Sequence, residues 1–390
     1  MTTAVEVHGT CDSAFERVRE AFAENFRRFD EVGASLAVVV DGKPVVDLWG
    51  GYADAARTRA WERDTIVNVW STTKGMTAVC AHRLADQRRL DLDAPVAKYW
   101  PEFAQAGKAA IPVRWLLSHQ AGLPAISEPL PVGAVFDWEM MVRALERQEP
   151  WWEPGTKHGY HAFTYGWLVG EVVRRITGKS LGTYFREEIA EPLGADFHIG
   201  TPSECDWRVA EIIPPEMPDL SKPNLLTRML SDSESISFKT IGNPPDLMVM
   251  GVIANSIAWR RAEIPAANGH GNARSVARVY GVLARGGEVD GVRIMSPGAI
   301  ERAIVEQASG PDEVMHLDLR TALGWILTSP EARLGPNQRA FGNSGAGGSL
   351  GFADLDAKVG FGYAMNRMIQ PPTLNDPRWA PMIDAVYASL

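Results

Sequence analysis

Cysteine, long apolar runs and clustered positive charge are all scarce in this chain of 390 residues. Its three cysteines, Cys11, Cys80 and Cys205, stand far apart, which excludes a disulfide framework and a CxxC metal site. No run approaches the roughly 18 to 20 continuous apolar residues of a membrane helix. Because the formal net charge is −9 and there is no long basic run, we expect neither nucleic acid nor a membrane as a partner.

Signals for export and for common cofactors are also missing. The start, MTTAVEVHGTCDSAFERVREAF, lacks the basic and then apolar segments of a signal peptide, so we expect a cytoplasmic protein. There is no Walker A motif, no GxGxxG after a strand, no HExxH and no EF-hand loop. His158 and His161, the closest pair among the eight histidines, lack a third ligand at a recognisable spacing. The sequence therefore predicts no cofactor and no metal.

The composition, 45% hydrophobic and 22% charged, is that of an ordinary globular protein. A capping-box pattern at Ser13 and apolar residues at helical spacing predict a first helix over 13–29. Two strand-like runs follow, 35–40 and 44–49, and Asp41-Gly42 between them is typical of a tight hairpin turn. The beginning of the chain therefore predicts antiparallel strands beside a helix.

The rest of the chain is helical in the middle and strand-rich toward its end. We predict an α+β fold, with an antiparallel sheet flanked by helices in an α/β domain of residues 1–90 and 266–390, and an inserted, mainly helical domain of residues 91–265. The segments on which this rests are helices over 163–176 (stopped by Gly178), 275–284 and 381–390, and strands over 324–328, 348–353 and 359–365.

Two serine motifs are candidates for chemistry. Gly347-Gly-Ser349-Leu-Gly351 matches GxSxG, but the hydrolase elbow of that pattern needs a following helix and a later histidine. A polar turn into another strand follows Ser349, and the last histidine, His316, precedes it. We therefore interpret Ser349 as part of a glycine-rich strand entry.

The second motif is Ser71-Thr-Thr-Lys74, an SxxK sequence. An apolar run over 66–70 ends at Ser71 and helical spacing follows over 72–85, which places the serine at a helix N-terminus with Lys74 on the same face. A lysine whose pKa is lowered by burial can take the serine proton. The alternative, a capping serine beside a solvated lysine, stays open on these residues alone.

Five blocks along the chain closely resemble the serine β-lactamase-like family, which includes class C β-lactamases, DD-peptidases and family VIII carboxylesterases. The esterase branch is the most similar, and it too carries a GxSxG that is not the nucleophile. The resemblance implies a β-lactamase/transpeptidase-like fold with the active site in the cleft between the two domains. The blocks are Trp49–Asp54, Val69–Ala78, Leu116–Leu123, Gly159–Trp167 and Phe341–Asp354.

The resemblance also implies roles for individual residues. Ser71 matches the acylated serine, Lys74 its general base, and Tyr160 the phenol that relays protons and can be partly ionised near Lys74. The backbone N–H groups of Ser71 and Ala346 match the oxyanion hole.

Two positions depart from the family pattern. The Y-x-N motif ends in Ala162 instead of Asn, which removes an amide that would bind an acylamino chain. The K-T-G or H-x-G motif reads Asn343-Ser344-Gly345, so the charge that recognises a β-lactam carboxylate is absent. Asn343 can still hydrogen-bond, and Gly345 lets a strand edge approach the acyl carbonyl, so we expect both to bind substrate.

These features predict a serine hydrolase that cleaves small carboxylic esters through an acyl-enzyme, with a small-molecule ester as its partner. Alternatives are a β-lactamase or D-Ala-D-Ala peptidase, an acyltransferase on the same scaffold, and a non-enzymatic scaffold. His119 and His270 are expected to make structural hydrogen bonds. Six of the 13 tryptophans are candidates for an apolar acyl pocket, although core packing is the expected role of each: Trp70, Trp115, Trp151, Trp152, Trp167 and Trp325.

Overall fold

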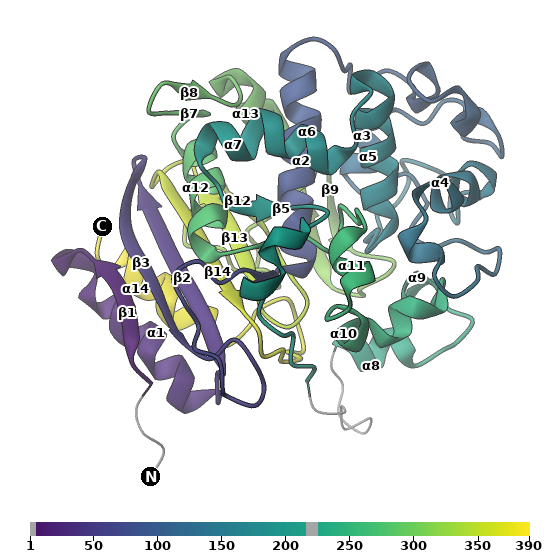
Figure 1. Ribbon diagram of the computed structural model, residues 1–390. Coiled ribbons are helices and arrows are strands. Elements are labelled where there is room, and N and C mark those ends of the chain that lie inside the picture. The colour runs from purple at the N-terminus through teal and green to yellow at the C-terminus, as the bar shows by residue number, and fades with distance from the viewer. Residues whose placement is uncertain (1–4, 216–224) are drawn as a thin grey trace.

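The computed structural model describes residues 5–215 and 225–390 and is built around one antiparallel sheet (Figure 1). Its strand order is β1-β3-β2-β14-β13-β12-β11-β10-β9, so strands from the beginning of the chain pair with strands from its end. The predicted α+β fold is confirmed. The strands are β1 Val7–Cys11, β2 Gly33–Val40, β3 Lys43–Gly51, β9 Ala308–Pro311, β10 Asp318–Thr321, β11 Ile326–Leu327, β12 Ala340–Ser344, β13 Leu350–Asp354 and β14 Val359–Met365.

The hairpin of β2 and β3 forms where the sequence predicts it. Asp41 and Gly42 both adopt positive φ, +47° and +81°, as the favoured two-residue hairpin turn requires. Val40 then pairs with Lys43 across the turn, and on its other side β2 pairs with β14, with Val40 opposite Val359. The hairpin therefore joins the two ends of the chain into one sheet.

Helices cover both faces of this sheet. On one face, α12 (Ala273–Ala284) approaches β14 so closely that a Cβ on Gly360 or Gly362 would lie 2.2 Å from helix backbone atoms. On the other face, α1 (Glu16–Arg28) packs against α14 (Trp379–Tyr387), and Asn25 Nδ2 donates to the Arg378 carbonyl at 3.3 Å. The sheet is thus buried between two helical layers.

The middle of the chain is mostly helical, as predicted. Among its described residues the named strand is β5 (Phe197–His198), which joins β4 (Val67–Asn68) and β6 (His270–Gly271) in a small sheet. The division into two domains stays a prediction. The helices here are α3 Val113–Leu117, α4 Trp138–Arg147, α5 Thr164–Thr177, α6 Leu181–Phe185, α7 Glu191–Leu193, α8 Leu225–Leu230, α9 Ile236–Gly242, α10 Met250–Ile253 and α11 Ile257–Arg261.

One further helix, α2 (Thr73–Asp86), packs against α5 and α6 and connects the helical part to the sheet. Glycine ends α5 as expected, since Gly178 follows it with φ +71°. The remaining elements are α13 Pro297–Ala303 and the short hairpin of β7 Glu288–Val289 and β8 Val292–Arg293.

Some element ends differ from the sequence prediction. The capping box at Ser13 does not form: Ser13 begins a 3-10 turn over Ser13–Phe15, and no side-chain cap is made before α1. The strand expected over 324–328 shortens to β11. The last helix begins at Trp379, so that Pro381 lies in its first turn, where a missing N–H costs nothing.

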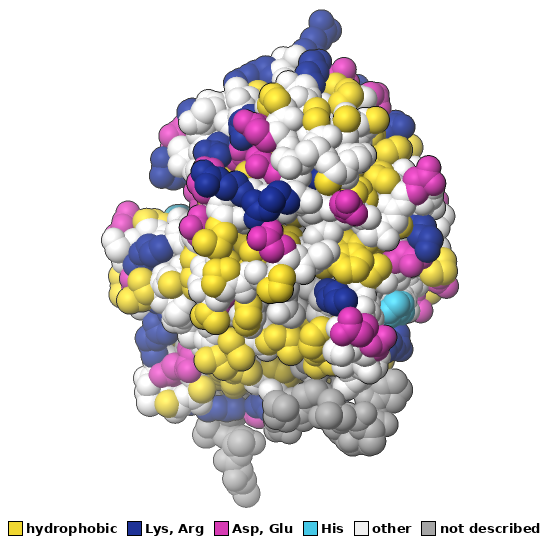
Figure 2. All heavy atoms as spheres, turned by 90° about the vertical axis from the view of Figure 1, so that its right-hand side faces the viewer, with side chains coloured by type: hydrophobic (Ala, Val, Ile, Leu, Met, Phe, Trp, Pro, Cys, Tyr) yellow, Lys and Arg dark blue, Asp and Glu magenta, His cyan; other side chains and the backbone are white. Residues whose placement is uncertain are grey.

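The surface mixes charges of both signs. Figure 2 shows the helical side, where acidic and basic side chains are interspersed and hydrophobic ones gather in the lower half. All three cysteines are free. Over the described residues, no helix combines the length and the apolar character that crossing a membrane would demand.

Candidate active site

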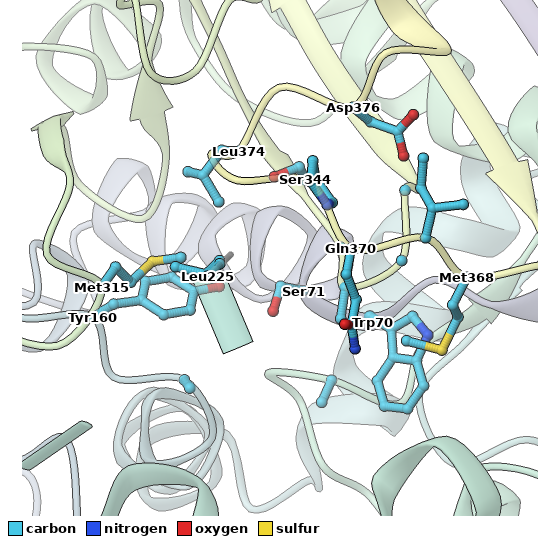
Figure 3. A pocket seen from close by; sticks show the side chains of 18 of the residues that line it. Trp70, Ser71, Tyr160, Leu225, Met315, Ser344, Met368, Gln370, Leu374 and Asp376 are labelled. Atoms are coloured by element: carbon cyan, nitrogen blue, oxygen red, sulfur yellow. The ribbon is translucent and has the colours of Figure 1, made fainter. Parts of the chain in front are cut away.

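A largely apolar cavity of about 200 Å³ lies beside the N-terminal end of α2 (Figure 3). Ser71 borders it, between Tyr160 on one side and Trp70 on the other. The helical middle of the chain and the sheet-forming segments both contribute to its walls. The other lining residues are Ala162, Phe163, Leu225, Met229, Ile241, Met250, Ala267, Met315, Ser344, Gly345, Ala346, Gly347, Gly348, Met368, Ile369, Gln370, Pro371, Thr373, Leu374, Asp376 and Trp379.

The backbone before α2 turns sharply and presents Ser71 to the cavity. Trp70 has φ +48°, a left-handed conformation that a bulky residue rarely adopts. Its indole is buried and lies 5.8 Å from the ring of Trp259, so packing holds the strained residue in place. A 3-10 turn over Trp70–Thr72 then leads into α2, and Ser71 stays half-buried at the helix N-terminus. Anionic charge is favoured at such a position.

Lys74 lies beneath Ser71, with 3.1 Å between Nζ and Oγ. Its Nζ also donates to the carbonyls of Ala162 at 2.6 Å and Ala266 at 2.9 Å. The side chain is fully buried, and desolvation lowers the pKa of Lys74 well below its usual value. A neutral amine can give its two hydrogens to the two carbonyls and turn its lone pair to the Ser71 hydroxyl, which is the arrangement of a general base.

Tyr160 completes the group. Lys74 Nζ lies 4.7 Å from the centroid of its ring. Burial raises the pKa of the phenol, and the nearby Ser71 hydroxyl lowers it by a smaller amount. The expectation of partial ionisation is therefore wrong, because desolvation outweighs the neighbouring groups and keeps the phenol protonated. The backbone N–H of Tyr160 donates to Asp312 Oδ1 at 3.1 Å.

Three histidines near the site are buried and hydrogen-bonded. Leu123 N–H donates to His161 Nε2 at 3.0 Å, so the proton of His161 lies on Nδ1 and bonds the Gly159 carbonyl at 2.6 Å. Burial lowers the pKa of His161 to about 4 and that of His119 well below its usual value. His119 Nδ1 accepts from His161 N–H, and His270 Nδ1 bonds the Asn268 carbonyl at 2.8 Å. Both make the structural hydrogen bonds expected of them.

The third motif lies only partly at the cavity. Asn343 is buried in β12 and is not among the described lining residues, and its Nδ2 donates to the Gly324 carbonyl at 2.9 Å. Its role in substrate binding stays a prediction. Gly345 and Ala346 do border the cavity, as Ser71 does. Their roles as substrate contact and oxyanion donor stay predictions.

Ser349 of the GxSxG sequence is fully buried. Its Oγ donates to the Val69 carbonyl at 2.6 Å and lies 3.0 Å from Thr72 Oγ1. Its carbonyl accepts from Gly345 N–H at 2.8 Å. Ser349 therefore joins the turn after β12 to the Val69 carbonyl and the Thr72 hydroxyl, on either side of Ser71, which is a structural role.

Several contributors to the site carry no signal in the sequence. The carbonyls that hold Lys74 belong to Ala162 and Ala266, and any residue offers a carbonyl. Of the six candidate tryptophans only Trp70 borders the cavity, whereas Trp379, which was not among them, does so as well. Trp379 and Asp376 lie close to the chain's end, far in sequence from every motif, so only the fold brings them to the site.

Comparison with known proteins identifies the family to which the chain is related. The sequence profile of the family described as Beta-lactamase matches residues 22–381. The chain is 39% identical over 378 residues to a protein called esterase/beta-lactamase LipL from Mycobacterium tuberculosis (strain ATCC 25618 / H37Rv), an alignment covering 95% of this chain and 85% of that protein.

Two solved structures are similar over nearly the whole chain. A family VIII carboxylesterase superposes with a TM-score of 0.88 at 46% identity, covering 99% of this chain and all of the other. A penicillin-binding protein homologue from Caulobacter crescentus superposes with a TM-score of 0.89 at 39% identity and the same coverage. The resemblance stated from the motifs is thereby confirmed. The chain belongs to the beta-lactamase family and is a serine hydrolase of the beta-lactamase fold.

Proposed function

We propose that this protein hydrolyses neutral carboxylic esters through an acyl-enzyme formed on Ser71. One observation carries the proposal: Ser71 Oγ lies 3.1 Å from the amine of a fully buried lysine and faces an apolar cavity. Burial favours the neutral amine, and a neutral amine beside a serine hydroxyl is a general base.

In the acylation half, Lys74 takes the Ser71 proton as Oγ attacks the ester carbonyl. The backbone N–H groups of Ser71 and Ala346 bind the oxyanion, and such a donor is typically worth about 3 to 4 kcal/mol in the transition state. The C–O bond to the alcohol then breaks, Tyr160 protonates the leaving oxygen, and the ammonium of Lys74 returns a proton to the phenol.

In the second half, water enters the same position. Tyr160 and Lys74 together accept one water proton as the oxygen attacks the acyl carbonyl, and Ser71 Oγ leaves with that proton restored. The products are the carboxylic acid and the alcohol, and the three side chains regain their starting protonation states. The phenol is suited to this relay because burial keeps it protonated at rest.

The walls of the cavity favour an uncharged substrate. Among the described lining residues, none is lysine or arginine, and the polar side chains are Ser71, Tyr160, Ser344, Gln370, Thr373 and Asp376. A β-lactam or a C-terminal peptide carries a carboxylate that would find no cation there. Ala162 offers no side-chain amide, and the Nδ2 of Asn343 already donates to the Gly324 carbonyl. Both features support an ester over a lactam or a peptide.

Lactam hydrolysis is kept as the second candidate because one relative is described as an esterase/beta-lactamase. The test is kcat/KM for p-nitrophenyl butyrate and for a chromogenic cephalosporin, measured side by side with Ser71→Ala as the blank. We expect the ester to be favoured by more than about a hundredfold, equivalent to about 2.7 kcal/mol of transition-state preference. An equal or faster cephalosporin reaction would overturn the ester proposal.

The remaining alternatives are separated by two added measurements. If an alcohol acceptor such as butanol diverts most of the acyl group into a new ester, the enzyme is an acyltransferase. If a fluorophosphonate probe labels no serine of the folded protein and Ser71→Ala changes no activity, the fold is a non-enzymatic scaffold.

A further inference from the structure

Arg378, just before α14, is a buried arginine outside the catalytic group. Only 1% of its side chain is exposed. It pairs with Asp376 through Nε–Oδ1 at 3.0 Å and Nη2–Oδ2 at 2.7 Å, and with Glu31 through Nη1–Oε2 at 2.9 Å. Both partners are as buried as Arg378. A cation held by two carboxylates in the interior has a fixed position, because leaving either partner unpaired is costly.

The fixed guanidinium also contacts the turn that borders the cavity. Arg378 Nη2 donates to the Gly347 carbonyl, and the indole Nε1 of Trp379 donates to the Gly348 carbonyl at 2.7 Å. Two consecutive side chains thus hold two consecutive carbonyls. The residue just before these carbonyls is Ala346, which borders the cavity.

The other side of this turn is held against the nucleophile. Gly345 N–H donates to the Ser349 carbonyl at 2.8 Å, and the Ser349 hydroxyl donates to the Val69 carbonyl at 2.6 Å. A Cβ on Gly345 would lie 2.3 Å from that same carbonyl. On the side of the turn that faces Arg378, a Cβ on Gly348 would lie 1.9 Å from Nη2. The turn therefore has no room for a side chain at Gly345, toward Val69, or at Gly348, toward Arg378.

We propose that Arg378 and Trp379 are positioning residues that direct the Ala346 N–H toward the carbonyl oxygen of the ester that Ser71 attacks. The proposal rests on the proposed function, in which that N–H is one of the two oxyanion donors. Arg378 does not border the cavity, and two carboxylates neutralise its charge, so it acts through the backbone and not on the substrate. A donor aimed in advance loses no free energy to reorientation during the reaction.

The first test is Trp379→Phe, which keeps an aromatic ring and removes the hydrogen bond to Gly348. The matched control is Trp151→Phe, which removes a Trp N–H bond of 2.9 Å to the Ala125 carbonyl, away from the cavity. The substrate is p-nitrophenyl acetate, whose acyl group is too short to be affected by space freed at the ring. We expect kcat to fall about tenfold for Trp379→Phe with KM within twofold, and no change for Trp151→Phe.

The second test is Arg378→Lys, since deleting the charge would leave two buried carboxylates unpaired and can prevent folding. Lysine keeps the charge but cannot reach Asp376, Glu31 and the Gly347 carbonyl together. We expect kcat to fall by ten- to a hundredfold. The inhibition constant of phenylboronic acid, which forms a tetrahedral adduct on the serine, should rise by the same factor, while inhibition by the product acid should not change. A purely structural role would lower only the apparent kcat, in proportion to the folded fraction found by active-site titration, and would leave both inhibition constants unchanged.

The outcomes are distinct. If both variants are folded and keep kcat and boronic acid affinity within twofold of the unmodified enzyme, Arg378 and Trp379 do not position the turn, and the proposed function is unaffected. If Ser71→Ala keeps full activity, the proposed function itself fails. A fall in kcat that is matched by the Trp151→Phe control would also overturn the positioning role.

Discussion

Ser71 and Ser349 both stand in sequence motifs typical of serine hydrolases, and the fold gives them opposite surroundings. Ser71 is half-buried at the start of α2, its hydroxyl faces the cavity, and an amine lies 3.1 Å away. Ser349 has no exposed surface, and its hydroxyl is engaged by the Val69 carbonyl and Thr72. A hydroxyl that donates to a backbone carbonyl has no base to take its proton.

The difference shows what makes a serine a nucleophile. Both residues lie beside the turn between β12 and β13, and both have neighbours whose backbone conformation is constrained. Of the two, only Ser71 borders the cavity and lies beside an amine whose pKa is lowered by burial, the proposed base. Variants that break this combination should make Ser71 as unreactive as Ser349. The expected losses of activity decrease from Lys74 to Tyr160 and are smallest for Ser349.

The largest effect is expected for Lys74→Met, which removes the base and keeps the length of the side chain. We expect kcat to fall by at least about 10⁴-fold, since members of a catalytic group that act together are each nearly indispensable. The control is Lys108→Met: Lys108 is also buried and donates to two carbonyls, those of Glu146 and Gln148, but it lies outside the cavity. Steady-state kinetics should show normal kcat for that control, and equal losses in both variants would contradict the role of Lys74.

A smaller loss is expected for Tyr160→Phe. Removing one general acid typically costs about 10² to 10⁴ in rate, so kcat should fall within that range while the rate of fluorophosphonate labelling of Ser71 changes less. The control is Tyr165→Phe, a second buried phenol whose ring lies 5.9 Å from Lys74 Nζ. Substrates with better leaving groups should partly rescue Tyr160→Phe. If activity is lost and better leaving groups do not restore it, Tyr160 does not protonate the leaving group.

The pH dependence tests the state of the base. Lys74 is active when neutral, so kcat/KM should rise tenfold per pH unit up to the pKa of Lys74, which burial places below its usual value, and then level off. The raised pKa of Tyr160 removes an alkaline fall in the ordinary range. His161, with a pKa of about 4, and His119, whose pKa is also lowered, should add no change of slope between pH 6 and 8. If the pH profile of kcat/KM changed slope between pH 6 and 8, and this change were lost in His119→Gln, the assignment of the profile to Lys74 would be refuted.

The smallest effect on activity is expected for Ser349→Ala. The variant loses one buried hydrogen bond and leaves the Val69 carbonyl without it, which should lower the free energy of unfolding by about 1 to 3 kcal/mol. Fluorophosphonate labelling and kcat/KM should stay within about threefold of the unmodified enzyme, since Ser71 and Lys74 are untouched. Urea denaturation measures the first quantity. A probe found on Ser349 and not on Ser71 of the unmodified enzyme, by peptide mapping, would mean that Ser349 is the nucleophile.

What the sequence predicts well is local. The Asp41-Gly42 hairpin and the end of α5 at Gly178 follow from backbone conformations that few other residues adopt, and both form as expected. β9 was not predicted, because its residues, Ala308-Ser-Gly-Pro311, contain two that disfavour strands. It is tolerated because it lies at the sheet edge, where a proline disrupts no second partner.

In the candidate site, too, the residues of local motifs could be predicted and those that depend on long-range packing could not. Ser71, Lys74 and Tyr160 could be named from the sequence because they stand in motifs that resemble those of the family, and the structure brings the three together. Asn343 was predicted to bind substrate because of its position in the motif. Its Nδ2 donates to the Gly324 carbonyl, and this hydrogen bond depends on the packing of β12, which the motif does not encode. The contribution of Arg378 depends on a backbone carbonyl far along the chain, which no local pattern encodes.

The pairing of β2 with β14 also determines when the enzyme can first become active. During synthesis, Val40 leaves the ribosome long before Val359, the residue it pairs with. Until then the hairpin has an open edge, and the turn that faces Ser71, between β12 and β13, has not been made. Closing so long a loop is slow as well as late. For most of its synthesis a chain therefore contains Ser71, the proposed nucleophile, without the rest of its site. Over the same time it exposes an unpaired strand edge, a feature that makes folding chains prone to aggregate and that chaperones cover.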